Sequence, residues 1–160
     1  MTPAQRRYVA IEAMIGAMIS AVLSIVFVLL MFGRLDRVPV MGGGGLIVDG
    51  VPQGFAIALM ATLVPTMLTR RRLALQRVAP IIGDAPRRSV GFFVQLLAIA
   101  MMGAGLTVAM TALLPVVGVD DVALMIVLAA KAVWGFVLGG VIAAIMTRAA
   151  LAADGIWHRT

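Results

Sequence analysis

The most regular feature of this chain is a succession of long apolar stretches separated by short polar segments. Residues 13–33, 50–69 and 89–119 carry no charged side chain, and a further stretch at 122–147 is interrupted only by Lys131. About 20 apolar residues in a helix are enough to cross a hydrocarbon core roughly 30 Å thick. The pattern therefore predicts four membrane-spanning helices, and the last of them contains a charged residue.

Each apolar stretch also carries small residues at every fourth position, which places them on one face of a helix. Helices in lipid approach closely where small side chains let their backbones touch. We therefore expect these positions to form the helix-packing surfaces. They are Gly16, Ser20 and Ser24; Gly54, Ala58, Thr62 and Thr66; Gly103, Thr107 and Thr111; and Gly135, Gly139, Ala143 and Thr147.

The spacing of the small residues suggests a duplicated helical hairpin, with chance similarity between apolar segments as the alternative. An offset of 87 residues maps Gly16 onto Gly103, and an offset of 81 maps Gly54 onto Gly135. Two hairpins joined by a linker on one side of the membrane are parallel repeats. We predict an all-α integral membrane four-helix bundle. It is a single domain over 1–160, with hairpin repeats at 8–72 and 89–150 and a cytoplasmic basic linker at 73–88.

Composition and charge placement extend this prediction to topology. With 62% hydrophobic and 12% charged residues, the chain has too little polar surface for a soluble globule. Most of its arginines flank the same ends of the helices, which by the positive-inside rule places both termini and the middle loop in the cytoplasm. The net charge of +6 then needs no nucleic acid as a partner. We expect lipid-headgroup contacts from Arg70, Arg71, Arg72, Arg77, Arg87 and Arg88.

Two segments of the chain resemble a known kind of protein. The sequence at 18–24, and the sequence at 58–66 followed by Arg70, Arg71 and Arg72, are similar to small bacterial two-helix membrane proteins of unknown function. The similarity covers mainly residues 13–72, with an echo in 98–150. The resemblance implies a two-helix hairpin unit in a bacterial inner membrane, and it implies no activity and no catalytic residues.

Charged residues inside the spans are the places where function would show, because an intramembrane charge is costly and usually faces a partner or a cavity. Glu12 and Lys131 are the two candidates. We interpret Glu12 as an acid near a helix N-terminus, stabilised by the dipole and by Arg6 or Arg7. We expect the fourth helix to be best defined from Ala132, so that Lys131 snorkels outward. The alternative is a buried lysine in an ion pathway.

Several polar side chains receive structural interpretations. We expect Trp134 and Trp157 at the headgroup level. The threonines of the spans could line a polar path, although such hydroxyls commonly bond the carbonyl oxygen one turn back. The 12 methionines are scattered along the helices, and we interpret them as core filling and not as a soft-metal site.

The sequence offers few residues for catalytic chemistry. The chain has no cysteine, its only histidine is His158, and no nucleophile, paired carboxylates or phosphate-binding loop can be assembled. We therefore predict no enzyme activity, no cofactor and no metal site. The preferred hypothesis is a membrane protein that acts by packing, as a homo-oligomer or as an accessory or scaffold subunit of a larger membrane complex. The alternative is a small four-helix transporter or channel that uses Glu12 or Lys131.

Overall fold

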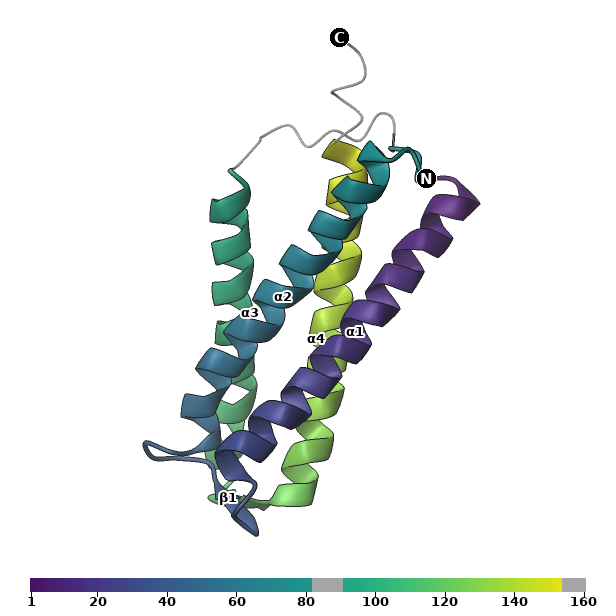
Figure 1. Cartoon of the computed structure of the whole chain (residues 1–160). Helices are drawn as coiled ribbons and strands as arrows, with labels where there is room; N and C mark the ends of the chain where they lie inside the picture. Colours follow the sequence, from purple (N-terminus) through teal and green to yellow (C-terminus); the bar gives the residue numbers. More distant parts are fainter. Residues whose placement is uncertain (82–90, 154–160) are drawn as a thin grey trace.

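A computed structural model of the chain describes residues 1–81 and 91–153 (Figure 1). Within these ranges lie four helices, each long and apolar enough to cross a membrane, which confirms the predicted spans. Two short strands lie in the loops at one end of the helices. The elements are α1 (Pro3–Phe32), β1 (Arg37–Pro39), α2 (Leu46–Ala74), α3 (Phe92–Val116), β2 (Asp121–Ala123) and α4 (Leu124–Ala153).

The start of α1 follows local capping signals, whereas the start of α4 differs from the prediction. Thr2 caps α1 in a capping box with Gln5, and Pro3 occupies the first turn, where its missing N–H costs nothing. The fourth helix begins at Leu124 and not near Ala132, so the expected start was wrong. The segment before Ala132 contains neither proline nor glycine, and its lysine lies inside the bundle, so nothing interrupts the helix there.

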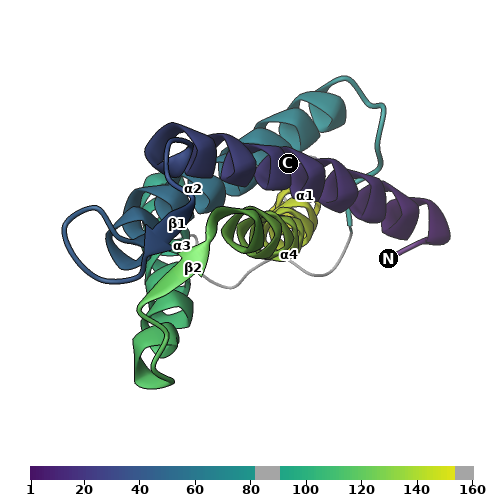
Figure 2. The same cartoon turned by 90° about the horizontal axis from the view of Figure 1, so that it is seen from below.

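The helices form two tightly packed pairs, α1 with α4 and α2 with α3 (Figure 2). Between α1 and α4, a Cβ atom at Gly16 would lie 2.7 Å from that of Ala143, and one at Gly139 would collide with Ser20. Between α2 and α3, a Cβ atom at Gly54 would lie 2.6 Å from the carbonyl oxygen of Gly103. All four small-residue faces are therefore used for packing within the chain, and the closest packing runs between the two predicted hairpins.

The loops with the two strands close one end of the bundle, which we call the ribbon end. There β1 and β2 pair antiparallel, with Val38 opposite Val122. Val38 and Val40 pack with Val28, Phe32 and Leu46 into a core cluster beneath the ribbon. The opposite end, which we call the terminal end, holds the start of α1 and the end of α4 (Figure 1).

The segment after α2 docks on the terminal end of the bundle. Ile81 packs with Val9, Leu73 and Leu151, and its N–H donates to the carbonyl oxygen of Leu151 over 3.0 Å. The Gln5 side chain donates to the carbonyl oxygens of residues 79 and 80. Residues 79–81 of the basic linker are thus held against the bundle.

Candidate functional site

Polar contacts between helices occur at one boundary, the surface where the α1/α4 pair meets the α2/α3 pair. Among the described residues, each side-chain hydrogen bond from one helix to another crosses this boundary. The bonds join Glu12 to Arg72, Tyr8 to Thr69, Gln95 to Met146, Trp134 to Thr107, and Lys131 to Asp49 and Gln53. Within each pair, by contrast, the helices meet through small side chains and backbone. The boundary is therefore the polar surface of this bundle.

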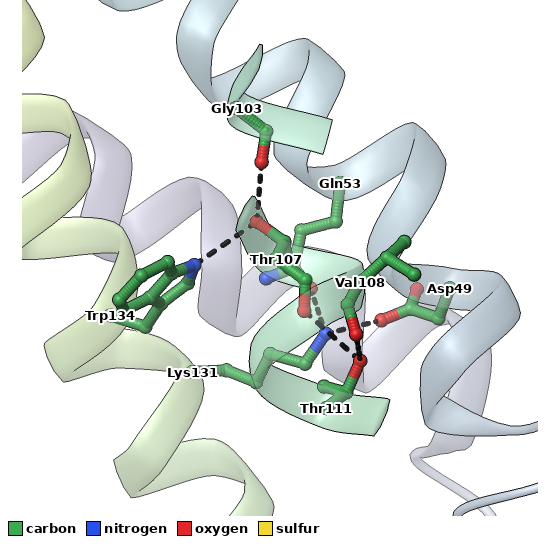
Figure 3. Close-up of polar contacts among 8 residues, drawn as sticks. All are labelled: Asp49, Gln53, Gly103, Thr107, Val108, Thr111, Lys131 and Trp134. Carbon is green, nitrogen blue, oxygen red and sulfur yellow. Dashed lines mark hydrogen bonds and ion pairs between the residues drawn. The ribbon is translucent and has the colours of Figure 1, made fainter. Parts of the chain in front are cut away.

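Lys131 belongs to the most buried ion pair among the described residues (Figure 3). It lies on α4, about 10 Å from the first residue of that helix at a rise of roughly 1.5 Å per residue. Its Nζ atom lies 3.0 Å from Oδ2 of Asp49 and 2.5 Å from Oε1 of Gln53, both on α2. The Lys131 and Asp49 side chains are only 6% and 1% exposed. The expectation that Lys131 snorkels outward was wrong, because its partners lie inside the bundle.

Asp49 and Gln53 were missed by the sequence analysis. Asp49 stands one residue before the uncharged stretch at 50–69, so it looked like a loop residue. The available signal was its spacing from Gln53, since two polar residues four positions apart lie on the same helix face. That face continues into Ile57 and Ala61, which are buried in the central core of the bundle.

Two atoms of this cluster have no hydrogen-bond partner among the described residues: Oδ1 of Asp49 and Nε2 of Gln53. A buried polar atom without a partner costs free energy, typically about 1–3 kcal/mol. On the α3 side, Thr107 accepts a hydrogen bond from Nε1 of Trp134 over 3.0 Å. The site thus combines an ion pair with spare donor and acceptor capacity. Trp134 thus lies beside this cluster, and its place at the headgroup level stays a prediction; Trp157 lies outside the described residues.

Glu12 belongs to a second ion pair, nearer the terminal end. Its carboxylate accepts a hydrogen bond from the guanidinium of Arg72 on α2, and that guanidinium also lies 5.4 Å from the centre of the Tyr8 ring. Glu12 is buried, whereas the Arg72 side chain is 38% exposed. The interpretation of Glu12 as paired with Arg6 or Arg7 was wrong, because its side chain faces α2. Arg72 binds this acid and remains partly exposed, so its contact with lipid headgroups stays a prediction.

The other arginines expected at headgroups have varied surroundings. Arg70 lies 5.0 Å from the centre of the Phe92 ring, and Arg71 and Arg77 are exposed. Arg87 and Arg88 lie outside the described residues. The serine and threonine hydroxyls follow the expected pattern, since Ser24, Thr62, Thr66, Thr107 and Thr111 each donate to the carbonyl oxygen one turn back. Their protons are therefore not available as a continuous relay.

A third ion pair lies at the surface of the ribbon end. Arg37 and Asp121 face each other across the two strands, with side chains 63% and 49% exposed. The hydrogen bond from Arg37 lowers the pKa of the Asp121 carboxyl below its ordinary value, and the pKa of Arg37 is raised for the same reason. This pair is a surface contact and offers a control for the buried ones.

Hollows open along the boundary, and buried charged side chains line them. One, of about 150 Å³, lies between α3 and α4 and is lined by Lys131, Thr107, Thr111 and Trp134 together with apolar side chains. Another, of about 330 Å³, lies under Gly43–Gly45 at the ribbon end and includes Asp49. A third, of about 370 Å³, lies between α1 and α2 and reaches Glu12. Asp49 and Lys131 therefore border separate hollows.

Comparisons with known proteins add nothing to this geometry: no family model, curated protein or solved structure matches the chain. The resemblance to two-helix membrane proteins stays a prediction. Over residues 1–81 and 91–153, no group of three histidine, cysteine or acidic side chains is close enough to hold a metal ion. The site is thus defined by its ion pairs alone.

Proposed function

We propose that this protein is a small proton-coupled membrane carrier whose coupling site is the Asp49–Lys131–Gln53 cluster. The observation that carries the proposal is the burial of both members of an ion pair, with two unpartnered polar atoms beside it, between membrane-length helices. Charged groups within membrane helices cost several kcal/mol each and are usually retained for ion or substrate pathways. A purely structural role would be served as well by apolar side chains of similar volume.

The chemistry of the proposed cycle is a proton exchange at one carboxylate. A proton that arrives through the hollow beside Asp49 adds to its carboxylate, forms a carboxylic acid and ends the ion pair with Lys131. Lys131 stays an ammonium and keeps its bond to Gln53. When the proton leaves Asp49 on the other side of the membrane, the ion pair forms again. One proton crosses in each cycle, and Asp49 and Lys131 are the titratable members of the cluster.

The packing supports a way to change access. The α1/α4 and α2/α3 pairs are each held by close backbone contact, whereas the boundary between them is held by polar bonds that can break and re-form. The hollow beside Lys131 lies between α3 and α4, and the hollow beside Glu12 lies between α1 and α2. Rocking of one pair against the other would open one hollow as it closes the other, as in carriers built from two halves.

The packing hypothesis loses its main argument in this structure. It relied on small-residue stripes in excess of what one bundle needs, but those stripes are occupied within the chain. Association as a homo-oligomer, or with other membrane proteins, therefore stays a prediction without a surface assigned to it. The lipid bilayer is the partner that the exposed apolar side chains of all four helices favour.

We also propose that the bundle is a parallel duplication with both termini in the cytoplasm of a bacterial inner membrane. Exchange of the two halves turns the α1/α4 contact into the α3/α2 contact, and the antiparallel pairing of β1 with β2 fits the same two-fold relation. Gly44→Cys and Ala79→Cys test the orientation in this cysteine-free chain. An impermeant thiol reagent added outside cells should label only the first. Labelling of only the second would reverse the topology.

Flux in proteoliposomes tests the carrier proposal. The purified protein should dissipate an imposed pH gradient, or respond to a potential, faster than protein-free liposomes. Lys131→Met should abolish the flux. Asp49→Asn/Lys131→Met should abolish it too, while keeping an uncharged cluster that leaves the fold intact.

The matched control is Arg37→Gln, which breaks an exposed ion pair at the ribbon that also contains an aspartate. Its flux should equal that of the unaltered protein. Equal flux from liposomes with and without protein, or unchanged flux in folded Asp49→Asn/Lys131→Met, would overturn the proposal.

A further inference from the structure

The hollow between α3 and α4 differs from the others in where it opens and in what it reaches. α3 packs chiefly on α2 and α4 chiefly on α1, so α3 and α4 leave a gap on the lipid-facing side. Met110 and Ile126 line the hollow and are themselves largely exposed on the outside of the bundle. A molecule dissolved in the bilayer would meet this opening directly.

The interior of this hollow is apolar except at its inner end. Leu114, Val127 and Ala130 contribute to its walls, and Lys131, Thr111 and the Trp134 ring line it where it approaches the boundary. Its volume of about 150 Å³ is similar to that of apolar cavities of about 150 Å³ that accept benzene. It therefore has room for a small headgroup and a few carbon atoms.

We propose that this hollow binds a single-chain anionic amphiphile, with the anionic group on Lys131 and the chain extending toward the lipid past Met110 and Ile126. The inference rests on the proposed carrier function and names its substrate class. Lys131 is the charged side chain among those that line the hollow, whereas Asp49 borders a different one. While Asp49 is ionised, the ammonium is bound to Asp49 and Gln53, so it becomes the cation offered to a ligand only when Asp49 is protonated. Protonation of Asp49 releases the ammonium for the ligand, so the anion accompanies the proton when it is present, while the proton cycle of Asp49 also runs without it.

Trp134 provides a direct readout, because its ring lines the hollow. Trp157→Phe leaves Trp134 as the only tryptophan of the chain. In nanodiscs of zwitterionic lipid, a dibrominated alkyl sulfate should quench its fluorescence, since bromine quenches indole at close range. The sulfate should act at a mole fraction at least about tenfold below that of a dibrominated alkyl trimethylammonium of equal chain length, as expected for one charged hydrogen bond.

Three variants in this background make the test specific. Lys131→Met should erase the preference for the anion. Asp49→Asn should strengthen it, because the competing carboxylate charge is gone. Val133→Trp combined with Trp134→Phe moves the indole to an exposed position on the same helix, where both probes should quench equally.

Equal quenching of Trp134 by the two probes, or a preference that survives Lys131→Met, would overturn the inference. So would selective quenching by brominated phosphatidylglycerol and not by the sulfate, since that result would assign the hollow to bilayer lipid. The flux assay above contains no amphiphile, so its outcome is independent. Flux without a preference for the anion would support the carrier proposal and overturn the proposed ligand. A preference for the anion without flux would support the ligand and overturn the carrier proposal.

Discussion

Over residues 1–81 and 91–153 two acids are buried, Asp49 near the ribbon end and Glu12 nearer the terminal end, and they have different partners. Asp49 is paired with Lys131, and both side chains are almost completely buried. Glu12 is equally buried, but its partner Arg72 is partly exposed. The first pair is closed to solvent on both sides, whereas the second has one member that water can reach. The Asp49–Lys131 pair can therefore serve as an internal site, whereas the Glu12–Arg72 pair connects the interior of the bundle to its surface.

The largest effects should come from breaking the closed pair on either side. Lys131→Met leaves the Asp49 carboxylate buried without a cation, and Asp49→Leu leaves the ammonium in the same position. Each should lower the free energy of unfolding by about 3–5 kcal/mol, the usual penalty for an uncompensated buried charge. Reversible unfolding in mixed micelles measures it. The double variant Asp49→Leu/Lys131→Met should recover most of the loss, and a double variant as unstable as the singles would contradict this account.

In the Glu12–Arg72 pair, substitution of the two partners should lower the free energy of unfolding by different amounts. Arg72→Gln leaves Glu12 buried and alone, so it should cost about 3 kcal/mol. Glu12→Gln leaves Arg72 free to turn toward water, so it should cost about 1 kcal/mol, closer to an exposed pair. The same unfolding measurement compares the two variants. Equal losses would mean that the two ion pairs of the bundle are alike.

A packing variant tests the close contact between α1 and α4. At Gly139 a larger side chain collides with Ser20 and forces α1 from α4, so Gly139→Leu should cost about 1–3 kcal/mol. Val141→Leu, at an exposed position of the same helix, should be nearly neutral. Thermal unfolding in detergent measures both. The same midpoint for the two variants would show that the α1/α4 contact is not close-packed.

The smallest effect should come from the exposed pair of the ribbon. Arg37→Gln removes the hydrogen bond that lowers the pKa of Asp121, so that pKa should rise toward its ordinary value. Since the folded-state pKa is lowered, the small stability it contributes is present above the ordinary pKa of aspartate and is lost as the pH falls through the folded-state value. Carbon NMR of the Asp121 carboxyl measures the change. An unmoved pKa would mean that Arg37 does not bind Asp121 in solution.

Local pattern predicted much of the fold and little of the site. The four spans and the small-residue faces follow from apolar runs and a four-residue spacing, which depend on neighbours along the chain. The site depends on Asp49 and Lys131, which are 82 residues apart. From its neighbours along the chain, Lys131 was predicted to extend its side chain to the surface, because an unpaired charge in an apolar helix is otherwise not solvated. Only its partner makes burial possible.

By itself, the sequence determined that this chain forms apolar helices able to cross a membrane, and which face of each helix can approach another closely. The tertiary structure alone decided that α1 packs on α4 and α2 on α3, that polar contacts gather on the boundary between these pairs, and that hollows reach the buried charges. The reason is physical. Small side chains permit close approach to any similar face, so their spacing does not specify a partner. An ion pair, in contrast, needs two particular side chains in contact, and only the complete packing of the helices brings Lys131 to Asp49.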